Sequence, residues 1–311
     1  MIEIRDLVKR YGDKVAVNGI SFTVNRGEVL GFLGPNGAGK STTMNIITGY
    51  LSSTSGSVTI NGHDILEEPI EAKKCIGYLP ELPPLYLDMT VIEYLNFMCD
   101  VKKVSKKERA GQLARIMSLV KIVDVADRLI GNLSKGYKQR VGIAQAMVGN
   151  PEILILDEPT VGLDPNQIRE IRKLIRLLAK DHTIIISSHI LPEIQAVCDR
   201  VVIINNGKVA AVDTIKDLSS RLNDSVKLLL TFKGDEKTVA NQIHAIPGVE
   251  DVFVRDSMEE GIGQIEIQIL SENDIRPQIF YEMARLNCPI IEMRILGASL
   301  EEVFLSITKG A

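Results

Sequence analysis

Apolar and polar positions along the first 220 residues follow two spacings, one typical of strands and one typical of helices. Residues 2–8 alternate apolar and polar side chains, as a half-buried strand does. Short apolar runs predict further strands at 17–24, 28–33, 153–156 and 183–187. Apolar residues three or four positions apart predict helices at 41–48 and at about 166–180. Because strands and helices alternate, we predict an α/β core.

Residues 85–150 depart from this alternation, because helical spacing dominates there. Apolar side chains recur at helical intervals at Val91, Leu95, Met98, Leu113, Ile116, Met117 and Val120. We therefore predict a mostly helical subdomain over residues 85–150.

The last third of the chain has its own rhythm and its own charge. Residues 221–311 hold 9 Lys or Arg and 15 Asp or Glu, whereas residues 1–220 hold 27 and 25. The predicted elements are strand 226–232, helix 236–246, strands 252–255 and 265–270, helix 275–286, strand 290–296 and a short helix 300–307. This order is typical of a ferredoxin-like plait. We predict two domains, residues 1–220 and a small α+β domain over 221–311.

Composition narrows the class of protein. The 311 residues are 45% apolar and 24% charged, as in ordinary globular proteins. No uncharged apolar stretch reaches the roughly 20 residues of a membrane-spanning helix, and the first residues show no signal-peptide pattern, so we expect a soluble cytoplasmic protein. Neither part is basic enough to indicate a nucleic-acid surface. The four cysteines form no C-x-x-C pair, which argues against zinc.

The motif with the clearest chemistry is Gly34-Pro35-Asn36-Gly37-Ala38-Gly39-Lys40-Ser41. It matches the phosphate-binding pattern G-x-x-x-x-G-K-[ST] and lies between a predicted strand and a predicted helix, where that mechanism requires it. Its backbone N–H groups and the helix N-terminus can cradle phosphates. We predict that Lys40 reaches the β- and γ-phosphates and that Ser41 binds Mg²⁺. We also predict that Thr42, the next residue, binds the nucleotide.

A second acidic motif follows the apolar strand 153–156. Asp157 is placed to hold Mg²⁺, and Glu158 to orient or deprotonate an attacking water. Two acids after an apolar run can also be explained as helix-capping residues. The phosphate loop in the same chain favours the catalytic interpretation.

Between these motifs lies Leu133-Ser134-Lys135-Gly136-Tyr137-Lys138-Gln139-Arg140, followed by an apolar helix. Ser134 has the character of an N-cap. In this position the segment resembles the signature sequence of the ATP-binding cassette (ABC) ATPases, and the resemblance covers about residues 1–215. It implies a P-loop NTPase core with an antiparallel β subdomain and a helical subdomain.

The same resemblance implies roles for further residues. Tyr11 resembles the aromatic residue that stacks on adenine, and because stacking tolerates any base, GTP is also a possible substrate. Gly162-Leu163-Asp164 resembles the D-loop at the dimer interface, and His189 the residue that contacts the γ-phosphate. Ser134 and Gly136 are then expected to contact ATP bound to the other subunit of a dimer.

The sequence departs from the family pattern in two places. Glu81 stands where the family usually has Gln, which keeps an oxygen for Mg²⁺ but adds negative charge. Lys135 and Tyr137 replace the third and fifth residues of the usual Leu-Ser-Gly-Gly-Gln signature. We expect ATPase activity with altered affinity.

The resemblance implies a dimer, with itself or with a related ATPase, that closes around two ATP and drives a separate transmembrane permease at the inner face of the membrane. The permease would dock near Leu82–Met89, although an ordinary surface loop fits that segment equally well. The C-terminal end resembles that of bacterial drug- and antibiotic-resistance exporters, which favours export. The C-terminal region is expected to support the dimer or to regulate it.

Two other functions are compatible with an ABC ATPase. Non-transport members act on ribosomes or nucleic acid, but those usually carry two cassettes, long coiled coils or zinc-binding cysteines, and this chain has one cassette without them. A regulatory nucleotide-binding module without hydrolysis would not need Glu158 and His189.

Overall fold

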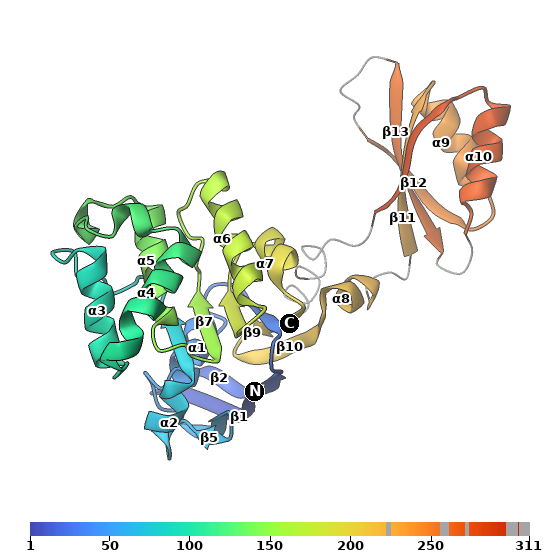
Figure 1. The fold of residues 1–311 in the computed structure, drawn as a ribbon. Coiled ribbons are helices and arrows are strands. Elements are labelled where there is room, and N and C mark those ends of the chain that lie inside the picture. Colours follow the sequence, from blue (N-terminus) through green and yellow to red (C-terminus); the bar gives the residue numbers. More distant parts are fainter. Residues whose placement is uncertain (222–224, 256–260, 271–273, 297–303, 305–311) are drawn as a thin grey trace. The chain divides into compact units, whose positions relative to one another are not determined.

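The computed structural model describes residues 1–311 except 222–224, 256–260, 271–273, 297–303 and 305–311 (Figure 1). The chain divides into two compact units, one over Met1–Ile215 and one that begins at Lys216. The predicted boundary after residue 220 lies inside helix α8 (Ile215–Arg221). Within the described residues, no helix is both long and apolar enough to span a bilayer.

The core of the first unit is a six-stranded sheet whose buried strands confirm the predicted α/β class. Its order is β10 (Lys208–Thr214), β9 (Arg200–Asn205), β3 (Val29–Leu33), β8 (Thr183–Ser187), β7 (Ile153–Asp157) and β6 (Ile76–Leu79). All pairs are parallel except β9 with β10. Every residue of β3, β7 and β8 is buried, as expected for strands covered on both faces. The carboxyl ends of these three strands therefore meet at one edge.

The helices of the core follow the strands. They are α1 (Lys40–Ile47) after β3, α2 (Pro69–Lys74) before β6, α6 (Pro165–Leu178) after β7 and α7 (Leu191–Val197) after β8. Helices α2 and α7 are short, and their sequences gave no helical periodicity that predicted them.

A second, antiparallel sheet joins the core. Its order is β2 (Lys14–Val24), β1 (Ile2–Tyr11), β4 (Ser55–Ile60) and β5 (His63–Asp64). One hydrophobic cluster includes residues of both sheets, and the rings of Phe22 and Phe32 lie 5.6 Å apart within it. The hairpin between β1 and β2 thereby holds Tyr11 beside the phosphate loop.

The region predicted to be helical contains α3 (Val91–Val101), α4 (Lys106–Val120), the short 3-10 turns η1 (Val123–Val125) and η2 (Ile130–Asn132), and α5 (Lys135–Met147). Thr90 and Glu93 form a capping box that fixes the start of α3. The N-cap predicted at Ser134 is confirmed, because its hydroxyl accepts a hydrogen bond from the N–H of Tyr137 at the start of α5.

The second unit contains β11 (Ser225–Lys233), α9 (Glu236–His244), β12 (Val249–Arg255), β13 (Ile262–Leu270), α10 (Arg276–Arg285) and β14 (Ile290–Leu296). The strands form an antiparallel sheet in the order β12-β13-β11-β14, with its own hydrophobic core. The elements occur in the predicted order, and the ferredoxin-like assignment stays a prediction. The helix predicted over 300–307 lies outside the described residues, apart from Phe304.

Candidate functional site

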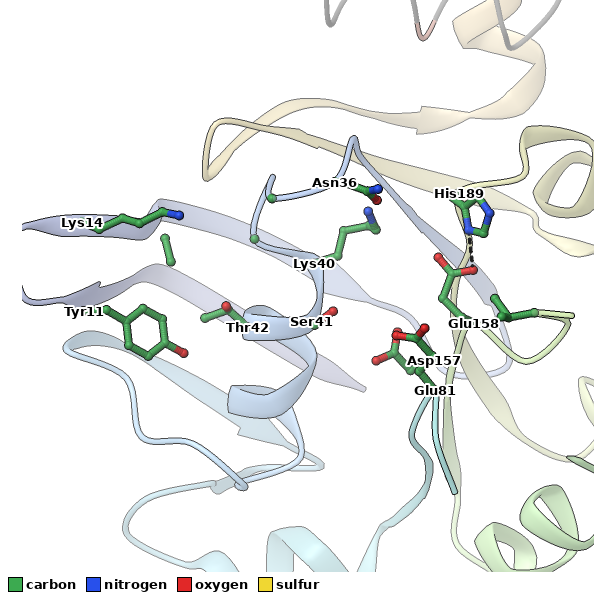
Figure 2. Close-up of a pocket in the computed structure, with 14 residues that line it drawn as sticks. Tyr11, Lys14, Asn36, Lys40, Ser41, Thr42, Glu81, Asp157, Glu158 and His189 are labelled. Atoms are coloured by element: carbon green, nitrogen blue, oxygen red, sulfur yellow. Dashed lines mark hydrogen bonds and ion pairs between the residues drawn. The ribbon is translucent and has the colours of Figure 1, made fainter. Parts of the chain in front are cut away.

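One cavity of about 470 Å³ lies between the phosphate loop, the end of β7 and the segment after β8 (Figure 2). Predicted site residues that line it are Tyr11, Asn36, Gly37, Gly39, Lys40, Ser41, Thr42, Glu81, Asp157, Glu158 and His189. Lys14, Ala16 and Val161 also line it, and no motif predicts them. Figure 2 shows Tyr11 and Lys14 on one side of the start of α1 and the three carboxylates on the other. The cavity therefore has an aromatic end and an acidic end.

The phosphate loop reaches its shape through backbone angles that suit glycine. Gly37 and Gly39 have φ of 80° and 105°, which L side chains rarely adopt. A Cβ on Gly39 would lie 2.5 Å from the carbonyl oxygen of Ala16, so the loop also needs the space. Gly39 is the N-cap of α1 and offers no side-chain cap, so N–H groups of the first helical turn can bind an anion.

Lys40 is folded back onto its own loop. Its Nζ donates to the carbonyl oxygens of Gly34 at 2.7 Å and Pro35 at 3.2 Å, while Ala38 is buried behind the loop. Burial lowers the pKa of the Lys40 ammonium, and the carboxylates across the cavity oppose that shift. Phosphate oxygens can replace the two carbonyls as acceptors.

Asp157 and Glu158 are joined through one serine on the neighbouring strand. Ser187 Oγ donates to Asp157 Oδ1 and accepts from the backbone N–H of Glu158 at 2.9 Å. Burial raises the pKa of both carboxyls, and for Asp157 the Ser187 hydrogen bond opposes the shift. Glu158 has φ of 48°, a left-handed conformation that costs a non-glycine residue on the order of 1–3 kcal/mol. The fold keeps the Glu158 side chain directed into the cavity despite the free-energy cost of this backbone conformation.

His189 pairs with Glu158 at the mouth of the cavity. His189 Nδ1 lies 2.9 Å from Glu158 Oε2 (Figure 2), with the Glu158 side chain 11% exposed and the His189 ring 55% exposed. The hydrogen bond favours the ionised carboxylate and so works against the effect of burial on the pKa of Glu158. His189 therefore orients Glu158 in addition to any contact with a phosphate.

The three oxygen-bearing side chains predicted to bind Mg²⁺, those of Ser41, Glu81 and Asp157, all line the cavity. Figure 2 shows the carboxylates of Glu81 and Asp157 next to one another and near Ser41. Among the described residues no cluster of three or more His, Cys, Asp or Glu side chains has metal-binding geometry. Magnesium bound to nucleotide takes one or two protein oxygens and completes its shell with phosphate and water, so this donor set fits.

The signature residues lie outside the cavity. Ser134 and Lys135 are exposed, whereas Gly136 is buried, and a Cβ on Gly136 would meet the Gln167 side chain at 2.8 Å. A Cβ on Gly162 would lie 2.0 Å from Lys135 Nζ. The signature thus packs on Gly162 and Gln167 of its own chain and does not line the cavity.

A buried carboxylate that sequence reasoning missed connects the two loops behind the cavity. Glu193 is 2% exposed and accepts from Thr160 Oγ1 and, at 3.4 Å, from Ser188 Oγ. Arg172 Nη2 lies 4.0 Å from its other oxygen. Thr160 follows Glu158 and Ser188 precedes His189, so Glu193 fixes these two segments against each other. The only sequence signal was an acid among the apolar residues of α7.

Comparison with known proteins places this geometry in context. The sequence matches the protein-family model described as ABC transporter over residues 17–161. It is 41% identical to the bacitracin transport ATP-binding protein BcrA of Bacillus licheniformis, over 100% of this chain and 98% of the relative. The linearmycin resistance ATP-binding protein LnrL of Bacillus subtilis (strain 168) is 33% identical, with 99% and 98% covered.

Solved structures resemble the first unit. The structure of an ATP-binding subunit of an ABC transporter has a TM-score of 0.66 at 32% identity, covering 71% of this chain and 92% of that one. The dimeric post-hydrolysis state of the ATP-binding cassette MJ0796, bound to ADP and Pi, has a TM-score of 0.63 at 25% identity, with 69% and 99% covered.

Proposed function

Because this chain belongs to the ABC transporter family as an ATP-hydrolysing subunit, we propose that two such subunits close around two ATP molecules and drive export through a separate membrane subunit. The observation that carries the proposal is the division of the site. The cavity is lined by the predicted catalytic and Mg²⁺-binding residues and by most of the phosphate loop, whereas the signature lies outside it, with Ser134 and Lys135 exposed on the same chain. A second subunit related by two-fold symmetry supplies the missing part to each cavity.

Within one cavity, the phosphate loop and Lys40 hold the phosphates, and Tyr11, a residue that is 50% exposed, stacks on the base. Ser41, Asp157 and Glu81 would hold Mg²⁺, which neutralises phosphate charge when it is bound. Glu158 takes the proton of the attacking water. Both its backbone, through Ser187, and its carboxylate, through His189, are positioned before substrate arrives.

The site for the membrane subunit is proposed on an exposed apolar surface around Leu82–Met89. Leu82, Tyr86 and Leu87 are 84%, 48% and 55% exposed. The ring of Tyr86 packs edge-on against Tyr94 and Phe97 of α3, with centroids 6.0 and 5.4 Å apart. An exposed apolar cluster on a supported segment favours a docking surface over an ordinary loop.

The names of the relatives support export of an antibiotic-type molecule. The ATP-binding subunit would act from the inner face of the membrane. BcrA is a bacitracin transport protein and LnrL a linearmycin resistance protein, and both match nearly the whole chain, including its second unit.

The shared site is tested by mixing two inactive variants, Lys40→Met and Ser134→Arg. Each alone is expected to lose ATPase activity. In a mixed dimer one of the two sites combines an intact phosphate loop with an intact signature, so mixing restores up to about a quarter of the wild-type rate. Mixing Lys40→Met with Glu158→Gln is the matched control, because both changes lie on the same side of the site and no intact site can form. Equal rates in the two mixtures would contradict the shared site.

The membrane partner is tested by affinity purification of the tagged chain from gently solubilised cells. We expect a stoichiometric multi-span protein that is lost from Leu87→Asp and retained by Leu177→Asp, another exposed leucine, on α6. Ribosomal proteins or nucleic acid in its place would favour the non-transport alternative.

A further inference from the structure

Strand β14 is an open edge of the sheet in the second unit. The strand order β12-β13-β11-β14 gives β14 one neighbour, β11, and among the described residues no strand lies on its other side. Ile291 and Ile295 are 51% and 54% exposed on this strand. An edge that exposes apolar side chains and unpaired backbone groups is a template for another strand.

We propose that β14 pairs with β14 of a second copy of this chain, antiparallel and about a two-fold axis at Met293. The two four-stranded sheets then become one eight-stranded sheet. Antiparallel pairing about Met293 places Glu292 opposite Arg294 of the second copy, and Arg294 opposite Glu292 of the second copy. Two opposite-charge pairs form from a single sequence, on one face of the joined sheet and within the regular part of β14.

The charges select this register over its neighbours. Directly opposed side chains must lie on the same face, so the symmetry axis passes through one residue of the strand. An axis at Glu292 would place two glutamates opposite each other, and an axis at Arg294 two arginines. Like charges in opposed positions destabilise a strand pair. An axis at Met293, between these two positions, places a glutamate opposite an arginine in both pairs.

The other edge strand, β12, has its charges engaged within the unit. Arg255 donates through Nε at 3.1 Å to Glu266, whose side chain is 5% exposed. Asp251 accepts from the N–H of Val252. On β14, in contrast, Glu292 and Arg294 form an ion pair with each other at 3.6 Å while both are about half exposed. That pair can be exchanged for pairs with a second copy without uncovering a buried charge.

This interface is separate from the ATP-dependent closure and is measured without nucleotide. The full-length chain is examined by sedimentation velocity over a range of concentrations. We expect a dimer whose Kd rises at least about tenfold in Glu292→Arg and in Arg294→Glu, since each change makes two attractive pairs repulsive. The double variant E292R/R294E restores both pairs with inverted charges and is expected to dimerise like the wild type.

Mixing the two single variants gives the sharpest result. A chain with Glu292→Arg presents two cations and a chain with Arg294→Glu two anions, so a heterodimer is expected from two weakly associating proteins. Asp251→Arg, the same charge change on β12, is the matched control and should leave the wild-type dimer intact.

Several outcomes would overturn the proposal. They are a wild-type monomer at every concentration, single variants that dimerise normally, or a loss of dimer in Asp251→Arg. A double variant and a mixture that both stay monomeric would also overturn it, because the opposed charges would then not set the pairing.

Discussion

The nucleotide cavity and the signature segment belong to the same unit but are built in opposite ways. In the cavity the central charged groups already have partners: Lys40 rests on carbonyls of its own loop, and Glu158 is held by Ser187 and His189. At the signature, Ser134 and Lys135 are exposed and the hydroxyl of Ser134 caps only its own helix. The cavity is complete except for its substrate, whereas the signature is half of a site.

This difference assigns separate tasks to the two regions. The cavity carries a buried network and a left-handed glutamate, so its residues affect chemistry and stability together. The signature has an ordinary capped helix start, so changes there should alter ATPase activity only through closure of the dimer. ATP favours the closed dimer by no more than the difference between its affinities for the closed and open states.

The largest effect should come from Glu158→Gln on the cavity side. The amide keeps the shape of the side chain but accepts no proton from water, so kcat should fall by about 10²–10⁴-fold with ATP binding retained. Steady-state ATPase rates and equilibrium ATP binding measure both quantities. Glu152→Gln, an exposed acid just before β7, is the control. Unchanged hydrolysis would remove Glu158 from its assigned role.

Next in size is Glu193→Ala, which tests whether the network behind the cavity supports the chemistry. The hydroxyls of Thr160 and Ser188 would lose a buried acceptor, so the free energy of unfolding should fall by about 1–3 kcal/mol. Because the segments of Glu158 and His189 would loosen, kcat should fall more than KM rises. Denaturant titration and ATPase kinetics test both effects. Glu193→Gln keeps an acceptor oxygen and should recover most of the loss; equal damage in both variants would contradict this account.

Tyr11→Ala weakens the aromatic end of the cavity. Lost stacking should cost about 1–3 kcal/mol of ATP affinity, with kcat at saturating ATP little changed. Isothermal titration with ATP and GTP measures the loss for each base. Tyr11→Phe, which keeps the ring, should bind normally. A loss of affinity for ATP but not for GTP would mean that the Tyr11 hydroxyl distinguishes adenine from guanine.

The pH profile sharpens the account of Glu158 and His189. Burial raises the pKa of Glu158, and a base is inactive when protonated, so turnover should fall, as pH decreases, at a higher pH than for an ordinary glutamate. His189→Ala removes the hydrogen bond that opposes burial, so this acid limb should move to still higher pH. Single-turnover rates, normalised to each plateau, measure it. A limb that moves to lower pH would contradict the assigned direction.

The smallest effect is expected from Lys135→Met at the signature. The change keeps the stem of the side chain but removes an exposed charge that contributes about 0–1 kcal/mol, so half-maximal ATP concentration should rise a few-fold at most. ATP titrations of the hydrolysis rate test this against Lys107→Met on α4. A fall in kcat comparable with that of Glu158→Gln would show that the signature contributes to chemistry, and the contrast between the two regions would be wrong.

Features that depend on short segments could be predicted. The glycines that allow the phosphate loop, the run of apolar residues in β7 and the cap at Ser134 each act within a few positions of the chain. The α/β class and the order of elements in the second unit followed from the same local periodicities. The short helices α2 and α7 could not be predicted because six or seven residues give too few repeats to show a helical pattern.

Features that depend on strand order could not be predicted. Nothing in the sequence places Ser187 beside Asp157, because that contact exists only where β7 and β8 are neighbours. The same holds for Glu193, which is an ordinary helix residue until Thr160 and Ser188 meet over it.

The sequence by itself therefore determined which groups this protein uses on a nucleotide: a glycine loop with Lys40, two acids after a buried strand, and a capped signature helix. Only the tertiary structure decided how those groups act. It gathered the carboxyl ends of parallel strands into one cavity, turned Glu158 toward His189 and left the signature outside. The physical reason is that backbone preferences act over a few residues, whereas burial, pKa shifts and hydrogen-bond networks arise between segments that only the packed sheet brings together.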